Sequence, residues 1–252
     1  MKAEAFVIHL ARAQGRAPQV ERLCKNLPMP VTVINAIDAE TLSDQEIARV
    51  YRPGLHRPHY PFSLRRTEIA CFLSHRRAWQ MILDRGLDAA LIVEDDVEPM
   101  PEFQGLLQHA LTSAGRGDFL RFPKKARERG PTMAEDGPAR IFVPRSVALG
   151  MQAQLVGRDA AAELLAFTRE FDRPVDTIIQ MRWLHGVRIL SSSPVAVREV
   201  AAELGGTTVQ GKAKPLAEIL SREFNRRWYR LALQARNFRE SLTRSRTGSV
   251  TH

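Results

Sequence analysis

Cysteine is scarce in this sequence. Its 252 residues include only Cys24 and Cys71, without a Cys-x-x-Cys pair or a cysteine and histidine spacing typical of a zinc site. The pair could form one disulfide, but two reduced thiols are the simpler expectation. Reduced thiols are typical of the cytosol. The cysteine content therefore favours a cytoplasmic protein without structural zinc.

Long hydrophobic runs are missing as well. The N-terminal run Ala5–Leu10 is short and contains His9, whereas a membrane span needs about 20 apolar residues. The apolar part of a secretory signal peptide is also longer than this run. The sequence predicts a protein that has no recognisable secretion signal and does not cross a membrane.

A phosphate-binding loop is also absent. No Gly-x-x-x-x-Gly-Lys-Ser/Thr motif occurs, and Glu94-Asp95-Asp96 lacks the flanking sequence of a phosphoaspartyl motif. A metal-dependent phosphoryl-transfer enzyme or hydrolase is an alternative that such an acidic triplet permits. The missing motifs argue against it.

Acidic residues are outnumbered, with 28 Asp and Glu against 37 Lys and Arg, which gives a net charge of +9. A basic surface attracts phosphates, nucleic acid or anionic lipid, and charge alone does not distinguish these partners. A nucleic-acid-binding protein would interleave aromatic and basic residues on one face. The body of this chain lacks that pattern, so we expect no nucleic-acid partner.

The basic excess is concentrated near the C-terminus. We divide the chain into a globular domain, residues 1–212, and a basic tail, residues 213–252. From Pro215 onward apolar residues recur at spacings of three and four with arginines between them, which predicts an amphipathic helix. Such a helix either docks on the core or lies on an anionic membrane surface. We favour the membrane surface and keep the docked helix as the alternative.

The order of the predicted elements indicates an α/β fold, because apolar β-rich runs alternate with helical patterns. Ser43, Thr67 and Asp159 are predicted to cap helices, and Gly86 to end one. Loops are predicted at 51–66 and 124–137. We expect strands at 5–8, 31–34, 89–93, 118–122, 140–143, 152–156, 187–190 and 195–197, and helices at 18–25, 43–50, 67–85, from 159 onward and at 178–184.

The most informative segment is an apolar strand that runs directly into three carboxylates. Ala89–Val93 is typical of a strand buried on both faces in a parallel sheet, and Glu94, Asp95 and Asp96 follow it. Buried carboxylates are costly without a cationic partner. Mg²⁺ and Mn²⁺ prefer such oxygen ligands and also bind phosphates. A divalent cation site is one interpretation, and a solvated acidic turn is the other.

A metal at this position suits glycosyl transfer from a nucleoside diphosphate sugar. The leaving diphosphate gains negative charge that a divalent cation stabilises, and the acceptor hydroxyl must lose a proton to a base. Asp176 is a candidate base, because it follows the rigid Pro174 and begins a helix. Simple capping of that helix is the alternative role for Asp176.

Two motifs in the first half of the chain resemble glycosyltransferase family 25. Glu68–His75 has the pattern E-x-x-C-x-x-S-H, and Glu94–Val97 has the pattern E-D-D-V. The resemblance extends over roughly residues 4–210 and leaves the basic tail outside. His9 stands where the family usually has asparagine.

The resemblance implies a GT-A-like nucleotide-binding fold with a mostly parallel central sheet. It implies inverting transfer of a hexose, galactose from UDP-galactose more often than glucose, to a glycan or glycolipid acceptor in lipopolysaccharide or lipooligosaccharide synthesis. The metal would be Mn²⁺ in preference to Mg²⁺. The protein would be cytoplasmic and peripheral at the inner face of the bacterial inner membrane. The implied catalytic residues are Asp176 and Glu94, the metal ligands Glu94, Asp95 and Asp96, and the donor-binding residues Arg12, Arg16, Asp38, Ser74, His75, Asp95 and Gln152.

Overall fold

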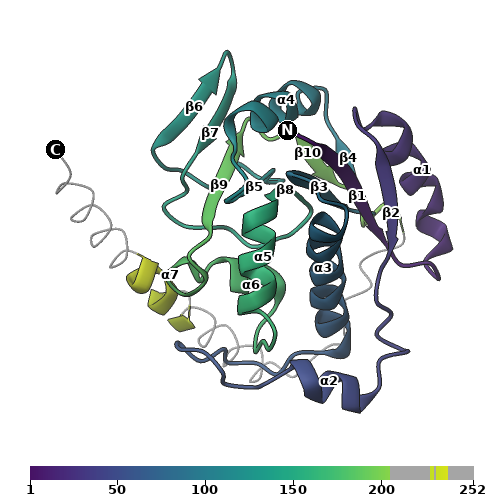
Figure 1. Ribbon diagram of the computed structural model, residues 1–252, viewed down its shortest axis with the longest axis vertical. Helices are drawn as coiled ribbons and strands as arrows, with labels where there is room; N and C mark the ends of the chain where they lie inside the picture. The colour runs from purple at the N-terminus through teal and green to yellow at the C-terminus, as the bar shows by residue number, and fades with distance from the viewer. Residues whose placement is uncertain (205–227, 230, 238–252) are drawn as a thin grey trace.

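The computed structural model describes residues 1–204, 228–229 and 231–237. Its centre is an eight-stranded sheet in the order β2-β1-β3-β8-β5-β9-β7-β6 (Figure 1). The strands are β1 (Ala3–His9), β2 (Val31–Asn35), β3 (Ala89–Glu94), β5 (Asp118–Arg121), β6 (Thr132–Asp136), β7 (Ala139–Phe142), β8 (Ala153–Gly157) and β9 (Arg188–Ser193).

Most strands of the sheet run in one direction. The pairings make β8 and β7 antiparallel to their neighbours, and the other strands of the sheet share one direction. The predicted α/β class with a mostly parallel central sheet is confirmed. The strand Ala89–Val93 was expected between parallel neighbours, but β3 pairs in parallel with β1 and antiparallel with β8. A two-stranded antiparallel sheet of β4 (Val97–Pro99) and β10 (Val197–Glu199) lies beyond the acidic turn.

Helices cover both faces of the sheet, because each strand alternates its side chains between two cores. In β1, Phe6 and Ile8 join the core beneath α3 and α5, which lie side by side in Figure 1. Ala5 and Val7 join the core beneath α1 and α4. The helices are η1 (Gln14–Arg16), α1 (Ala17–Asn26), α2 (Asp44–Val50), α3 (Arg66–Asp84), α4 (Phe103–Ser113), α5 (Arg158–Phe167), α6 (Val175–Ile179) and α7 (Arg182–His185).

The helix ends correct two of the predicted caps. Ser43 forms the predicted capping box with Glu46, and Gly86 has a positive φ of 61° just after α3. Thr67 does not cap α3, because Glu68 accepts the N–H of Arg65 at 2.8 Å and the helix begins at Arg66. Asp159 does not cap α5 either. Strand β8 runs straight into that helix, whose cap is Gly157.

Three further predictions differ from the structure. The predicted loop 124–137 contains β6, whose largely exposed side chains hid it, and a positive φ of 54° at Gly137 turns it into β7. The predicted helix 178–184 is divided between α6 and α7. Helix α4 was not predicted. The loop 51–66 is free of regular helix or strand up to Arg66, and both cysteines are free, as expected.

Only a short part of the basic tail belongs to the described residues. Residues 228–229 and 231–237 are helical. Tyr229 and Leu233 join the core on the α3 side of the sheet, while Trp228 is 69% exposed and Leu231 is 56% exposed. This part is docked, as the alternative interpretation expected. The boundary at 212, the turn at 205–208 and the rest of the predicted tail helix lie outside the described residues.

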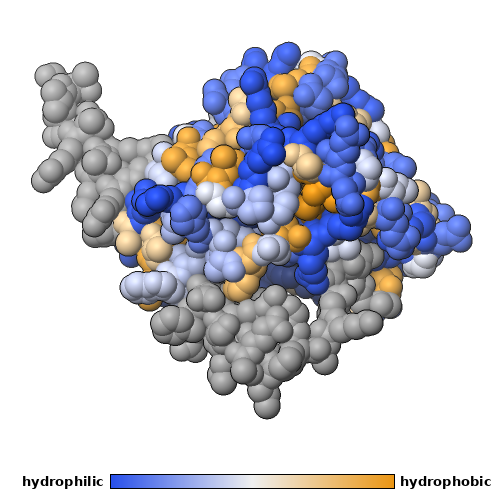
Figure 2. Space-filling model, turned by 90° about the horizontal axis from the view of Figure 1, so that it is seen from below, coloured by the Kyte–Doolittle hydropathy of each residue, from blue (hydrophilic) through white to orange (hydrophobic). Residues whose placement is uncertain are grey.

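The surface is consistent with the composition. Figure 2 shows a largely hydrophilic face on which hydrophobic patches are interspersed. Within the part of the chain that the structure describes, no helix combines the length and the apolar character needed to cross a membrane.

Candidate functional site

The acidic turn lies beyond the carboxyl end of β3, next to the ends of its parallel neighbour β1 and of β2. Glu94 is the last residue of β3, and Asp95 and Asp96 form the turn before β4. The side-chain alternation of a strand therefore stops at Glu94. Ligands of α/β sheets bind at this end of the strands. The fold thus places the predicted site where binding chemistry is expected.

Asp95 is held from both sides by basic groups. Its carboxylate contacts Nδ1 of His9 at 2.7 Å, and the guanidinium of Arg16 donates to its other oxygen. Asp95 is 5% exposed and Arg16 is 8% exposed. Because both oxygens of Asp95 have protein partners, its role in this structure is to fix Arg16 beside the acidic turn.

Asp96 is different, because one of its oxygens is buried without a partner. Asp96 is 8% exposed, and its Oδ1 has no hydrogen-bond partner among the described residues. Its Oδ2 lies 3.4 Å from the guanidinium of Arg16. Burial, together with the neighbouring Glu94, raises the pKa of Asp96 to about 7. A buried anionic oxygen in this position fits a hard divalent cation.

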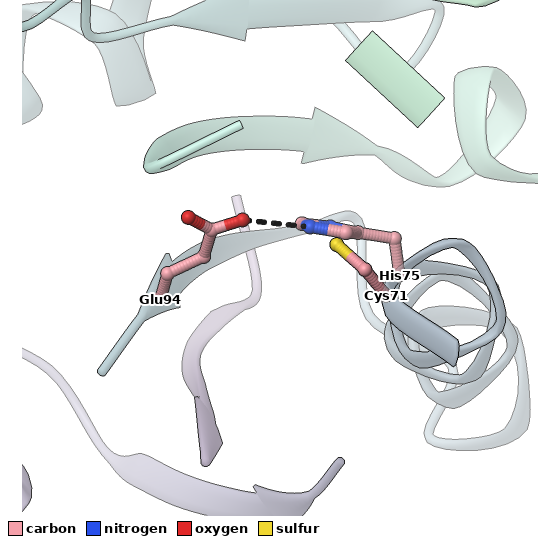
Figure 3. Close-up of side chains that lie close together, drawn as sticks. All are labelled: Cys71, His75 and Glu94. Atoms are coloured by element: carbon pink, nitrogen blue, oxygen red, sulfur yellow. Dashed lines mark hydrogen bonds and ion pairs between the residues drawn. The ribbon is translucent and has the colours of Figure 1, made fainter. Parts of the chain in front are cut away.

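Glu94 is oriented by a histidine from α3 (Figure 3). Nε2 of His75 lies 3.2 Å from Oε1 of Glu94, and Nδ1 of His75 lies 3.3 Å from Nε2 of Gln154. If Gln154 donates to Nδ1, then Nε2 of His75 carries the proton and donates to Glu94. His75 is 1% exposed, so it is a hydrogen-bonded core histidine that positions the carboxylate.

Cys71 lies beside this pair, one helical turn before His75. The ligand atoms of Cys71, His75 and Glu94 lie within 4.8 Å of one another. No metal site with cysteine and histidine was expected from the sequence, and the spacing does not reveal this grouping because Glu94 arrives from a different element. Burial, followed by the charge of Glu94, raises the pKa of the Cys71 thiol well above its ordinary value. A protonated thiol and a donating imidazole are poor metal ligands.

A cavity of about 270 Å³ opens beside the acidic turn. Arg12, Arg16, Ser74, His75 and the three acidic residues all line it. Ser74 is also structural, because its hydroxyl accepts the N–H of Ile37 at 2.9 Å and donates to the carbonyl of Ala70 at 2.8 Å. It thereby ties the segment after β2 to α3.

Asp38 is not among the residues that line this cavity. Its carboxylate forms an ion pair with Nε of Arg12 at 2.7 Å, and Nη1 of Arg12 lies 2.8 Å from Glu40. The structure therefore gives Asp38 the role of holding Arg12 at the cavity mouth. The two predicted donor-binding residues lie together, and only Arg12 faces the cavity.

Asp176 and Gln152 line a second, larger cavity of about 580 Å³. Asp176 does not cap α6, since the cap is Pro174 and its own carboxylate accepts the N–H of Gly150 at 3.0 Å. Burial raises the pKa of Asp176 against the lowering effect of that hydrogen bond. The carbonyl of Gln152 accepts the N–H of Glu94 at 2.9 Å, which links the two cavities through one backbone contact.

Sequence reasoning missed a buried arginine in the second cavity. Arg121, at the end of β5, is 5% exposed and pairs with Glu128. It also donates to the carbonyl of Gly150 at 2.9 Å, the residue whose N–H holds Asp176. A charged residue inside the predicted apolar strand 118–122 was the available signal, because buried arginines need partners.

The fold and the site define a class of protein. An α/β sheet with a buried acidic turn and two adjoining cavities beyond its strand ends belongs to proteins that bind ligands at that edge. The model of glycosyltransferase family 25, described as an LPS biosynthesis protein, matches residues 2–179. This chain belongs to glycosyltransferase family 25.

Three relatives show how the similarity is distributed. Procollagen galactosyltransferase 1 of Danio rerio is 31% identical over 43% of this chain and 18% of its own length. A glycosyltransferase 25 family member of Drosophila melanogaster is 29% identical over 69% of this chain and 28% of its own length. An inactive family member 3 of Homo sapiens is 32% identical over 43% of this chain and 19% of its own length. The chain spans less than a third of these relatives.

Proposed function

We propose that this protein is a metal-dependent, inverting glycosyltransferase that moves a hexose from a UDP-sugar to a glycan or glycolipid acceptor. Galactose is the proposed hexose, with glucose second. The observation that carries the proposal is the buried, unpartnered Oδ1 of Asp96 in a cavity lined by Arg12 and Arg16. Family membership supports a sugar donor and a glycan acceptor.

The cavity beside the acidic turn is the proposed donor site. Asp96 and Glu94 would hold the metal, because both oxygens of Asp95 are already engaged by His9 and Arg16. The proposed metal is Mn²⁺ in preference to Mg²⁺. When bound, the ion would act as a Lewis acid for the diphosphate leaving group. Arg16 is fixed by Asp95 and adds positive charge for the same diphosphate. Ser74 and His75 keep the cavity wall and Glu94 in position.

Asp176 is the proposed general base. Its carboxylate is held by the N–H of Gly150 and lines the second cavity, where we place the acceptor. A base with a raised pKa binds the acceptor proton more strongly than an ordinary aspartate. Attack by the activated hydroxyl on the face of the sugar opposite the diphosphate would invert the anomeric centre.

The biological setting is also part of the proposal. The family description mentions LPS biosynthesis, and we propose a bacterial lipopolysaccharide or lipooligosaccharide acceptor. We place the protein in the cytoplasm, peripheral at the inner membrane. Trp228 and Leu231 are exposed, and the sequence of residues 213–252 is rich in arginine, which suits an anionic surface. Deletion of residues 215–252 should weaken binding to vesicles that contain anionic lipid, and unchanged binding would refute the membrane role.

The enzymatic proposal is tested by UDP release from UDP-galactose in the presence of Mn²⁺. Asp96→Ala should lower turnover by at least about a hundredfold, since Lewis-acid stabilisation contributes several kcal/mol. Asp176→Asn should lower it by about a hundredfold or more, as expected for a lost general base. Glu102→Gln is the control, because Glu102 is exposed and its side chain does not cap α4.

A non-catalytic family member is the second candidate function, because this chain resembles a relative named as inactive. Binding and turnover separate the two candidates. In a thermal-shift panel, a nucleotide sugar that binds with Mn²⁺ should raise the melting temperature of the wild type by mass action in either case. Stabilisation without any UDP release would favour the non-catalytic candidate, and unchanged turnover in Asp96→Ala would refute the metal assignment.

A further inference from the structure

The second cavity has an aromatic wall. Tyr60 lies edge-on to Phe62 with ring centroids 5.6 Å apart, and edge-on to Tyr229 with centroids 5.4 Å apart. All three residues line the cavity. Tyr60 and Phe62 belong to the proline-rich loop 51–66, and Tyr229 comes from the helical residues near the C-terminus. Aromatic rings with polar tips give a ligand an apolar face together with hydrogen-bonding groups.

The fixed position of this wall depends on a buried arginine. Nη1 of Arg173 donates to the hydroxyl of Tyr229 at 2.6 Å, and Nη2 of Arg173 donates to the carbonyls of His56 and Pro58 at 3.0 and 3.1 Å. Arg173 is fully buried and is neutralised by Asp172. One guanidinium thus joins the loop and the C-terminal helix, so the aromatic group is preorganised.

The remaining lining of the cavity is strongly basic. Four cationic residues line it, against the single carboxylate of Asp176. Arg121 is neutralised by Glu128, and Lys124 forms an ion pair with Glu199 at 2.5 Å. The other two cations, Lys125 and Arg127, have no such partner among the described residues.

Lys125 and Arg127 are exposed at the cavity. Within the residues that the structure describes, the side chain of neither one forms an ion pair or a hydrogen bond. Two unneutralised cations close to one partly buried carboxylate favour an anionic ligand. A cationic acceptor group, such as an amine of a basic peptide, would be repelled by the same pair.

We propose that the acceptor is an acidic saccharide, one that carries a phosphate or a carboxylate. Its sugar ring would pack on Tyr60 and Tyr229, its acidic group would contact Lys125 and Arg127, and its hydroxyl would face Asp176. This inference rests on the proposed function and names its acceptor class. Arg12 and Arg16 line the cavity proposed for the donor, whereas Lys125 and Arg127 line the second cavity and are available to the acceptor.

The test measures equilibrium binding, so that it does not depend on turnover. Glucose, glucose 6-phosphate and glucuronate, with the matching galactose series, are titrated by ligand-observed NMR with UDP and Mn²⁺ present. We expect the phosphates and uronates to bind about tenfold tighter than the neutral sugars, as two charge-assisted contacts allow. High salt should reduce the difference.

Two variants test which residues produce the preference for acidic sugars. The double variant Lys125→Ala/Arg127→Ala should lose the preference for acidic sugars, whereas Arg129→Ala should keep it. Arg129 is an exposed cation two residues further along that does not line the cavity. Equal binding of neutral and acidic sugars by the wild type would overturn the inference, and so would a preference that survives in the double variant. UDP release from UDP-galactose by the wild type and by Asp96→Ala tests the proposed function separately, so this inference can fail while the proposed function stands.

Discussion

Asp96→Asn removes a single buried charge and keeps the shape of the side chain. Burial and Glu94 hold the pKa of Asp96 at about 7 in the folded protein, against an ordinary value of 3.8. Because the folded pKa is the higher one, folding favours the protonated carboxyl. The contribution of Asp96 to stability is therefore greatest at low pH, falls as the pH rises from about 4 to about 7, and is constant above that.

The size of the effect follows from the same pKa difference. At about 1.4 kcal/mol per pKa unit, ionised Asp96 costs the metal-free protein at most about 4 kcal/mol above pH 7. The asparagine in the variant would carry no charge, so the free energy of unfolding of the metal-free variant should rise by up to that amount. For a domain of this size the change corresponds to a Tm increase of about 10 °C. At pH 4 the two proteins should be nearly equal.

Differential scanning calorimetry at pH 4 and pH 8, with and without Mn²⁺, measures the pH-dependent stability cost of this charge and its contribution to Mn²⁺ binding. The wild type should be stabilised by Mn²⁺ at pH 8, and Asp96→Asn should be more stable without metal and nearly indifferent to Mn²⁺. Glu102→Gln should behave as the wild type throughout. An Asp96→Asn protein that is less stable at pH 8, or that keeps the full response to Mn²⁺, would refute this explanation.

Three other substitutions test the packing around the two cavities and, at the opposite end of β3, the junction of β8 and α5. Arg16→Ala should lower the free energy of unfolding by about 3 kcal/mol, because it leaves Asp95 buried with only His9; a loss below about 1 kcal/mol in urea unfolding would contradict this. Tyr229→Phe should lower the free energy of unfolding by about 2 kcal/mol, because it removes the acceptor of an Arg173 hydrogen bond. An unchanged free energy in the same urea titration would contradict this. Gly157→Ala should cost about 2 kcal/mol or more, since the new Cβ would lie 2.2 Å from the carbonyl of Arg116; an unchanged Tm would show that the strand-to-helix junction is looser than described.

Local patterns predicted much of the fold. The strand before the acidic turn, the helix predicted at 67–85 and the capping box at Ser43 each depend on residues close in sequence, and the structure confirms them, with that helix at Arg66–Asp84. Strand β6 and helix α4 were missed for a physical reason. Strand β6 is largely exposed and so lacks an apolar alternation. Helix α4 has no side-chain cap and no acidic residue in its first turn, so it lacks the local signals of a helix start.

The site was predictable only in part, because its contacts join distant elements. The three consecutive carboxylates were visible in the sequence, but the partners and roles of each carboxylate were not. Arg16 and His9 engage Asp95, so the unpartnered oxygen belongs to Asp96. The aromatic wall of the second cavity combines the loop 51–66 with Tyr229 through the buried Arg173. No local pattern connects segments so far apart along the chain.

We propose that this chain transfers a hexose from a nucleotide sugar at the acidic turn. The most direct measurement is mass spectrometry and NMR of the product formed from UDP-galactose, Mn²⁺ and a deacylated lipooligosaccharide core. We expect one added hexose with an inverted, β-configured anomeric centre, formed by the wild type and not by Asp96→Ala. Hydrolysis of simple phosphate esters without any hexose transfer, or transfer that persists in Asp96→Ala, would contradict the claim.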